Sequence, residues 1–170
     1  MKQAHVFLGM GANLGNRKAN LEAALERLSR LGSIQSVSSI YETEPVGAEW
    51  TPLFLNMACH TITRRTPHEV LEITLSIERE LGRRRTTPNA PRPVDLDILL
   101  YDDLVLCDSN LSIPHPGLTE RAFVLVPLAE IAPDVVDPRS GATIRQLLRR
   151  CGDTHWVRPY DGGAYVQTVR

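Results

Sequence analysis

The segment TPHEVLEITLSIERELG, residues 66–82, continues through the loop RRRTTPNAPRP, residues 83–93, into VDLDILLY, residues 94–101. Thr66, Pro67 and Glu69 supply an N-cap, a proline at the first helical position and a capping-box glutamate. The apolar residues that follow repeat at helical spacing up to Gly82, which is well placed to end a helix. The last of the three pieces is an apolar run typical of a buried strand. The segment therefore predicts a long helix, an arginine-rich loop and a strand.

The residues before this segment predict a second long helix and further strands. The expected elements are a strand over residues 4–10, a helix capped by Asn16 that ends before Gly32, a strand over 33–41 and an extended run over 54–62. Together with the first segment, they follow the order β-α-β-β-α-β. We therefore expect an α+β fold of the ferredoxin-like split βαβ type, a sandwich with a mainly antiparallel sheet and flanking helices, the two long ones on one face.

The residues after 101 predict smaller elements. These are extended pieces over 104–107 and 111–113, helical turns over 117–131 interrupted by Pro127, and a short helix over 143–150. Residues 152–170 form a C-terminal tail with little periodicity. A length of 170 residues without a linker signal predicts one domain over residues 1–170.

The composition excludes several classes of protein. With 42% hydrophobic and 23% charged residues the chain suits one globular core, and its formal charge of -1 provides no general basic field for nucleic acid or an anionic membrane. No apolar stretch approaches the roughly 18 residues of a membrane span. Three cysteines without a C-x-x-C pair fit a reducing compartment. We expect a cytoplasmic protein that binds neither nucleic acid nor membrane, and we expect a monomer.

The sharpest chemical signal is the pair Asp95 and Asp97 on the predicted strand. Positions i and i+2 of a strand point to the same side, so the two carboxylates lie side by side and repel each other. Partial burial makes two ionised carboxylates costly unless a cation lies between them. Mg²⁺ suits such a pair, because it keeps waters and takes further ligands from phosphates. The alternative is a pair of acids that form salt bridges with nearby arginines.

Positive charge is concentrated next to these acids. Between Glu78 and Arg92 the chain has five arginines and two glutamates, a net charge of +3. Arginine binds phosphate in a bidentate manner, and an exposed loop of this kind can close over a polyphosphate. Farther along, His115 lies between two prolines, which hold its imidazole rigidly for a phosphate hydrogen bond. The alternatives are a solvated charged loop and a histidine in an ordinary polar turn.

Two aromatic positions and one amide could recognise a flat ligand. Phe54 and Asn56 are two residues apart on one strand, so a ring and an amide point to the same side. Phe123 offers a second ring face, although core packing is the alternative for both phenylalanines. The glycines at positions 9, 11 and 15 have the wrong spacing for a dinucleotide fold, and we assign them to turns after the first strand.

Taken together, these motifs resemble a known family. The resemblance spans about residues 6–148 and rests on LGMGANLGN (8–16), YETEPVG (41–47), FLN (54–56), IERELGR (77–83), APRPVDLDILL (90–100), IPHP (113–116) and RAFVL (121–125). The combination Pro-Arg-x-x-Asp-x-Asp-Ile followed by Pro-His is specific. The chain resembles the 6-hydroxymethyl-7,8-dihydropterin pyrophosphokinases of folate biosynthesis.

The resemblance implies transfer of a diphosphate from ATP to the hydroxymethyl oxygen of a reduced pterin, with release of AMP. It implies two Mg²⁺ ions held by Asp95 and Asp97, and catalytic roles for these acids and for Arg83 and Arg92. The implied ATP-binding residues are Glu78, Arg83, Arg92, Ile98, Ser112, His115 and Arg121. The implied pterin-binding residues are Thr43, Val46, Phe54, Asn56, Asp95 and Phe123.

The chain departs from the family pattern at a few positions. Ala90-Pro91-Arg92 replaces a common Trp-Gly-Pro-Arg, which removes one aromatic lid over the pterin, and Leu75 and Pro116 replace a glutamine and a tyrosine. Two other functions remain as alternatives. One is a different Mg²⁺-dependent nucleotidyltransferase or phosphohydrolase; the other is a non-catalytic RNA-binding module, which the low aromatic content and the charge disfavour.

Overall fold

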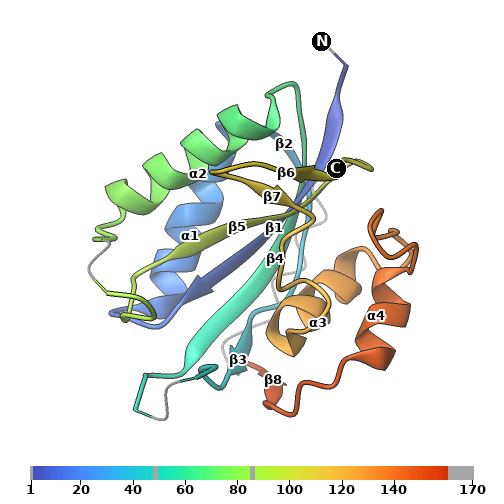
Figure 1. The fold of residues 1–170 in the computed structure, drawn as a ribbon. Helices are drawn as coiled ribbons and strands as arrows, with labels where there is room; N and C mark the ends of the chain where they lie inside the picture. The colour runs from blue at the N-terminus through green and yellow to red at the C-terminus, as the bar shows by residue number, and fades with distance from the viewer. Residues whose placement is uncertain (1, 48–49, 85–86, 161–170) are drawn as a thin grey trace.

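In the computed structural model, which describes residues 2–47, 50–84 and 87–160, one antiparallel sheet runs through the molecule (Figure 1). Its strands are β1 (Ala4–Ala12), β2 (Gly32–Val37), β3 (Tyr41–Thr43), β4 (Phe54–Thr63), β5 (Asp95–Tyr101) and β8 (Val157–Pro159). The order across the sheet is β5-β1-β4-β3-β8, and β2 also pairs with β4. Two short strands, β6 (Leu106–Cys107) and β7 (Ser112–Ile113), form a separate hairpin.

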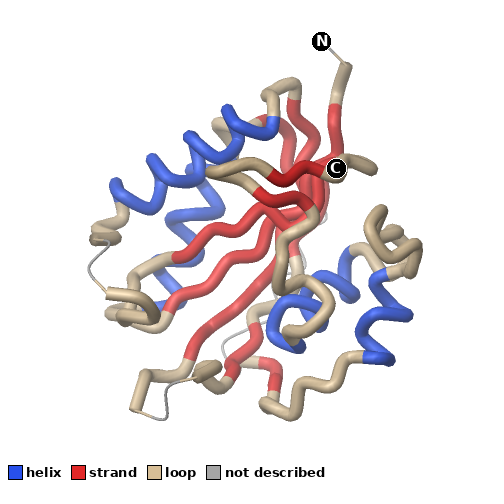
Figure 2. Tube along the Cα trace, in the orientation of Figure 1, coloured by secondary structure: helices blue, strands red, loops and turns tan. Residues whose placement is uncertain are grey.

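Helices cover both faces of the sheet (Figures 1 and 2). The long helices α1 (Arg17–Leu28) and α2 (Pro67–Glu80) pack on one face, against a core that includes Val6, Leu8 and Met10 of β1. The shorter helices α3 (Ala122–Ile131) and α4 (Ile144–Arg150) pack on the other face, against Phe7 and Leu99. Alternate residues of β1 therefore belong to different cores, as the two-residue period of a strand requires. The predicted fold is confirmed.

The predicted helix ends are confirmed at three positions. Asn16 accepts a hydrogen bond from the backbone N–H of Ala19 and so caps α1. Thr66 and Glu69 form both halves of a capping box at the start of α2. At the other end of this helix Gly82 has a φ of +89°, a conformation that glycine adopts without steric cost.

The predicted strand over residues 33–41 is divided into β2 and β3. The register of β2 against β4 shifts between Ile34 and Ser36. Ser38 follows the end of β2, and its hydroxyl, rather than a backbone carbonyl, accepts the hydrogen bond of the Ala58 N–H at 2.8 Å. Because a side-chain oxygen takes the place of a backbone carbonyl here, the hydrogen-bond ladder is interrupted between β2 and β3.

Three further predictions were wrong in detail. The helix over Pro127 is not interrupted, because α3 runs through this residue and buries it with Val124, Leu125 and Leu128, which offsets the missing hydrogen bond. Gly9 and Gly11 lie within β1 and not in a turn, whereas Gly15 has the expected positive φ of +69°. The C-terminal tail contains strand β8, which pairs with the distant β3.

Within the described ranges, no helix is long and apolar enough to cross a membrane.

Candidate active site

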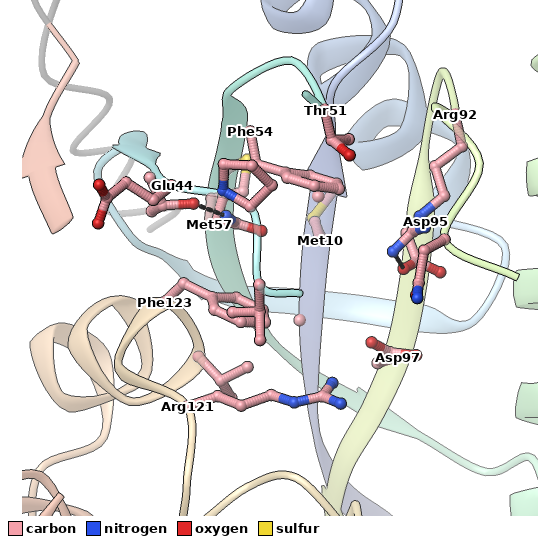
Figure 3. A pocket seen from close by; sticks show the side chains of 18 of the residues that line it. Met10, Glu44, Thr51, Phe54, Met57, Arg92, Asp95, Asp97, Arg121 and Phe123 are labelled. Atoms are coloured by element: carbon pink, nitrogen blue, oxygen red, sulfur yellow. Dashed lines mark hydrogen bonds and ion pairs between the residues drawn. The ribbon is translucent and has the colours of Figure 1, made fainter. Parts of the chain in front are cut away.

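A cavity of about 350 Å³ opens on the face of the sheet that α3 and α4 cover only in part (Figure 3). Its walls come from β1, β4, β5, the segment after β3 and the start of α3. The lining residues that the sequence predicted for the site are Thr43, Val46, Phe54, Asn56, Arg92, Asp95, Asp97, Arg121 and Phe123. The fold thus brings together both the predicted acids and the predicted aromatic residues.

One end of the cavity is charged. Asp95 and Asp97 of β5 both face it, as the alternation of a strand requires. Arg92 Nη2 lies 2.9 Å from Asp95 Oδ2, and Arg83 Nη1 contacts Asp95 Oδ1. Burial acts to lower the pKa of Arg83, but the charges of Asp95 and Glu78 outweigh it and raise this pKa above its usual value. Arg83 therefore stays cationic beside the acids.

Asp97 lacks a comparably close arginine in the described structure. Its Oδ1 lies 3.8 Å from His115 Nε2, and desolvation together with the negative charge of Asp95 raises the pKa of Asp97 to about 7. His115 accepts a hydrogen bond from the Gly117 N–H at its Nδ1, which leaves Nε2 as the protonated nitrogen of the neutral ring. Burial and the charge of Arg121 lower the pKa of His115. The His115 N–H is thus directed toward the acids.

The other end of the cavity is aromatic and amide-lined. Figure 3 shows the rings of Phe54, from β4, and Phe123, from α3, one above the other. Arg92 stands over the Phe54 ring at 5.2 Å and Arg121 near the Phe123 ring at 5.8 Å, so each ring has a guanidinium beside it. The two ends of the cavity therefore meet at these arginines.

Asn56 is held in place from two sides. Its Nδ2 donates a hydrogen bond of 2.7 Å to Thr43 Oγ1, which leaves its remaining amide atoms for a ligand. Gly11 of β1 lies opposite Asn56, and a Cβ atom at this position would come within 2.8 Å of Asn56 Oδ1. Gly11 therefore leaves space for the Asn56 amide. This explains why a glycine lies within β1, although the sequence predicted a turn at this position.

A second cavity of about 270 Å³ lies in the arginine-rich loop. Its described lining includes Arg83, Arg84 and Thr87, and it shares Asn89 and Arg92 with the first cavity. The loop thus continues the charged end of the site away from the aromatic end. Residues Arg85 and Thr86 of the predicted loop lie outside the described residues.

Four predicted ATP-binding residues lie outside the lining of both described cavities: Glu78, Ile98, Ser112 and His115. Of these, His115 is next to the first cavity, because its Nε2 lies 3.8 Å from Asp97 Oδ1. Glu78 is only 3% exposed, and its Oε1 accepts hydrogen bonds from Arg83 and from the Leu96 N–H. Ile98 is buried in the core between the sheet and the long helices. Ser112 lies in β7, opposite Cys107. In this structure Glu78 supports Arg83 from beneath.

Sequence reasoning gave no role to Asn13. This side chain is 2% exposed, and its Oδ1 accepts a hydrogen bond from the Arg92 N–H at 2.8 Å. Its Nδ2 also reaches the Pro52 carbonyl at 3.5 Å. Asn13 therefore connects the segment that carries Arg92 with the segment before β4. The available signals were its place shortly after the predicted strand and within the motif LGMGANLGN (8–16). The cavity also includes Met10, Glu44, Thr51 and Met57, which were not predicted.

The chemistry of the charged end fits Mg²⁺. Asp95 and Asp97 present carboxylate oxygens on one side of a strand, and desolvation followed by the negative charges of Asp95 and Glu78 raises the pKa of Asp97. Across the described ranges, no group of three or more His, Cys, Asp or Glu side chains could hold a metal ion alone. Two carboxylates suit a metal that takes its other ligands from water and phosphate.

The chain matches known proteins over most of its length. The family model described as 7,8-dihydro-6-hydroxymethylpterin-pyrophosphokinase matches residues 7–133. The 2-amino-4-hydroxy-6-hydroxymethyldihydropteridine pyrophosphokinase of Methylorubrum extorquens is 44% identical over 146 residues, which cover 85% of this chain and 91% of that protein. The protein of the same name from Bacillus subtilis is 43% identical over 142 residues, or 82% of this chain and 85% of that one.

Solved structures agree on the fold. An HPPK-DHPS protein from Plasmodium falciparum superposes with a TM-score of 0.74 at 18% identity, over 88% of this chain and 45% of that one. This chain thus spans less than half of that solved chain. The family model, the relatives and the cavity lead to one conclusion: the chain belongs to the 7,8-dihydro-6-hydroxymethylpterin-pyrophosphokinase family.

Proposed function

We propose that this chain transfers a diphosphate from ATP to the hydroxymethyl oxygen of 6-hydroxymethyl-7,8-dihydropterin, as a step of folate biosynthesis. The observation that carries the proposal is a single cavity with an aromatic, amide-lined end and a charged end. A flat heterocycle whose hydroxymethyl group accepts a diphosphate needs both ends of such a cavity. Membership of the pyrophosphokinase family supports the same reaction.

The aromatic end would bind the pterin. Phe54 and Phe123 would stack on the two faces of the ring, and Asn56 would bind its polar edge. Backbone groups at Thr43 and Val46 line the same end. An analogue without the matching donors and acceptors would leave buried groups unpaired, which disfavours its binding.

The charged end would bind the triphosphate. Arg83 and Arg92 would contact its oxygens, and Arg121 of the cavity lining and His115, which lies beside Asp97, would add contacts. Ile98 and Ser112 would lie on the adenine side of ATP, and Glu78 would lie on the nucleotide side. Glu78 would act there through Arg83, because it is buried beneath that side chain.

In the reaction, the hydroxymethyl oxygen forms a bond to the β-phosphorus of ATP. The bond from that phosphorus to the oxygen it shares with the α-phosphorus breaks, AMP leaves with this oxygen, and one proton is released. Asp95 and Asp97 would hold two Mg²⁺ ions, which when bound neutralise phosphate charge. The protein's own contribution is to align the two substrates and to keep donors directed at the phosphates.

Product analysis tests this function directly. The protein is mixed with ATP, Mg²⁺ and the dihydropterin, each is omitted in turn, and nucleotides are separated by chromatography. AMP that forms only with all three present supports diphosphate transfer. ADP or free phosphate without the pterin would indicate a phosphohydrolase, and a lack of turnover by folded protein would contradict the proposal.

We also propose a cytoplasmic monomer with residues 1–170 as one pyrophosphokinase domain. The three cysteines, Cys59, Cys107 and Cys151, are unpaired, which fits a reducing compartment. Both core clusters share one sheet, which supports a single domain. Analytical ultracentrifugation tests the oligomeric state, and a dimer at micromolar concentration would contradict it.

A further inference from the structure

The segment 153–160 follows the part of the chain that the family model matches, yet it contacts the aromatic end of the cavity from two directions. One set of contacts reaches the start of α3. The other reaches β3 and the residue after it. The first set ends on Ala122, whose two chain neighbours line the cavity, and the second includes the lining residues Thr43 and Glu44.

The first set of contacts is made by Asp153. Its Oδ2 accepts a hydrogen bond of 2.9 Å from the backbone N–H of Ala122, the first residue of α3. The N-cap residue of this helix, Arg121, makes no capping hydrogen bond of its own. Asp153 therefore supplies, from a distant part of the chain, an acceptor for one of the four N–H groups at the start of the helix that have no partner within it. Ala122 lies between Arg121 and Phe123, both of which line the cavity.

Asp153 is itself rigidly held. Its side chain is 6% exposed, and its Oδ1 accepts a hydrogen bond from the His155 N–H at 3.0 Å. The same oxygen lies 2.5 Å from His155 Nδ1. A buried carboxylate with partners on both oxygens has little rotational freedom, so it defines where α3 begins.

The second set of contacts is made by β8. This strand pairs with β3 in antiparallel register, with Val157 opposite Thr43. The Trp156 N–H donates to Glu44 Oε2 at 2.9 Å, and Arg158 Nη2 lies 2.6 Å from Glu42 Oε1. Thr43 and Glu44 both line the cavity, and Thr43 in turn accepts the hydrogen bond of Asn56.

We propose that the segment 153–160 positions the pterin end of the active site, with Asp153 as the positioning residue for Phe123 and β8 as the support of Thr43. Most of the phosphate end is carried by other elements. Asp95 and Asp97 lie on β5, at the opposite edge of the sheet from β8, whereas the proposed phosphate contact Arg121 lies directly before Ala122. The segment therefore controls affinity for the pterin more than affinity for ATP. This inference rests on the proposed function, since it assumes that a pterin occupies the aromatic end.

The test compares Asp153→Ala and Asp153→Asn with the wild type. The asparagine keeps an oxygen that can accept the Ala122 N–H, whereas alanine removes it. Asp134→Ala is the matched control, because Asp134 also pairs with a basic side chain, Arg145, but is a largely exposed residue outside the cavity lining. Thermal unfolding of each variant establishes that it is folded. AMP formation then gives kcat and KM for each substrate, and the Kd for pterin is measured by calorimetry without ATP.

We expect Asp153→Ala to raise the KM and Kd for the pterin five- to tenfold, with the KM for ATP and kcat within threefold of the wild type. Asp153→Asn should restore the pterin values to within twofold, and Asp134→Ala should not change them. Unchanged pterin affinity in a folded Asp153→Ala, or an equal rise in both KM values, would overturn the inference. If the wild type forms no pterin-dependent AMP, the proposed function itself fails.

Should Asp153→Ala fail to fold, Arg158→Ala replaces it, since this exposed side chain forms an ion pair with Glu42 of β3. A twofold or larger rise in the KM for pterin, without a rise for ATP, is then expected. No change in either KM would overturn the role of β8.

Discussion

The Oδ1 atom of Asn13 accepts a hydrogen bond of 2.8 Å from the Arg92 N–H, and the Asn13 N–H donates to the Arg92 carbonyl at 3.1 Å. This reciprocal pair attaches the end of the arginine-rich loop to the end of β1. The Arg92 side chain can therefore reach both the Phe54 ring and Asp95 from a fixed backbone.

Asn13→Ala is expected to lower both stability and activity. A buried N–H of Arg92 would lose its partner, which costs about 1–3 kcal/mol in the free energy of unfolding, measured with urea. We also expect kcat to fall at least about tenfold, since Arg92 would lose its fixed position. Asn16→Ala is the control: it removes a helix cap at a cost of about 1 kcal/mol and should leave kcat unchanged. Equal kcat values for the two variants would contradict a specific role for Asn13.

Asp97→Asn is expected to raise the stability of the protein at pH 8 and to lower its activity. The pKa of Asp97 is raised to about 7 in the folded protein, above the value near 4 of an unfolded chain. The folded state then binds the proton more tightly, so this group lowers stability as the pH rises from about 4 to 7, and the penalty is complete above pH 7. In metal-free buffer at pH 8, Asp97→Asn should therefore unfold at a higher urea concentration than the wild type, and at pH 4 the difference should vanish.

The same variant should lose at least about 100-fold in kcat, because the carboxylate proposed to hold Mg²⁺ is gone. Chelation of Mg²⁺ by excess EDTA should abolish turnover of the wild type. A fully active Asp97→Asn would refute the metal assignment, and a lower stability at pH 8 would refute the charge argument.

Glu78→Ala is expected to destabilise the protein strongly. Glu78 is buried and accepts hydrogen bonds from Arg83 and the Leu96 N–H, so its removal leaves a half-buried guanidinium without this partner. Arg83 keeps its contact with Asp95, so the main cost is that of the unpaired Leu96 N–H, about 1–3 kcal/mol in the free energy of unfolding. Glu78→Gln, which keeps an acceptor oxygen, should cost less, and its KM for ATP should rise through the displaced Arg83. If Glu78→Gln left Arg83 in place in a crystal structure and still raised this KM, a direct contact with the nucleotide would be indicated instead.

Gly11→Ala should weaken pterin binding without an equal effect on ATP. The new Cβ would meet Asn56 Oδ1 at 2.8 Å and push the amide out of its hydrogen bond with Thr43. We expect the KM for the pterin to rise about tenfold, the equivalent of one lost hydrogen bond. Gly152→Ala is the control, because a Cβ there meets nothing within 4 Å. A normal KM for Gly11→Ala would show that Asn56 adapts or does not bind the pterin edge.

Local sequence signals were sufficient for most of the fold. The capping box at Thr66 and the positive φ at Gly82 depend only on residues a few positions apart, and so does the placement of Asp95 and Asp97 on one side of a strand. These features were predicted because hydrogen bonds and alternation within one segment determine them. The family resemblance then added the substrates.

Other features depend on partners far away in the chain. The strand β8 exists because β3 pairs with it, and the break after Val37 follows from a hydroxyl of Ser38 bonded to Ala58. A glycine occupies position 11 of β1 because a Cβ atom there would collide with Asn56 Oδ1. No local pattern encodes these pairings, since each is decided by which segments meet when the sheet forms.

For this protein the sequence by itself determined most of the elements and their order, the paired acids and the aromatic and amide residues of the site, because alternation and capping are properties of short segments. Only the tertiary structure decided that Glu78 lies beneath Arg83, that Asn13 holds Arg92, and that Asp153 caps the helix that carries Phe123. The physical reason is that a buried polar group must find a partner wherever the folded chain provides one, however distant in sequence.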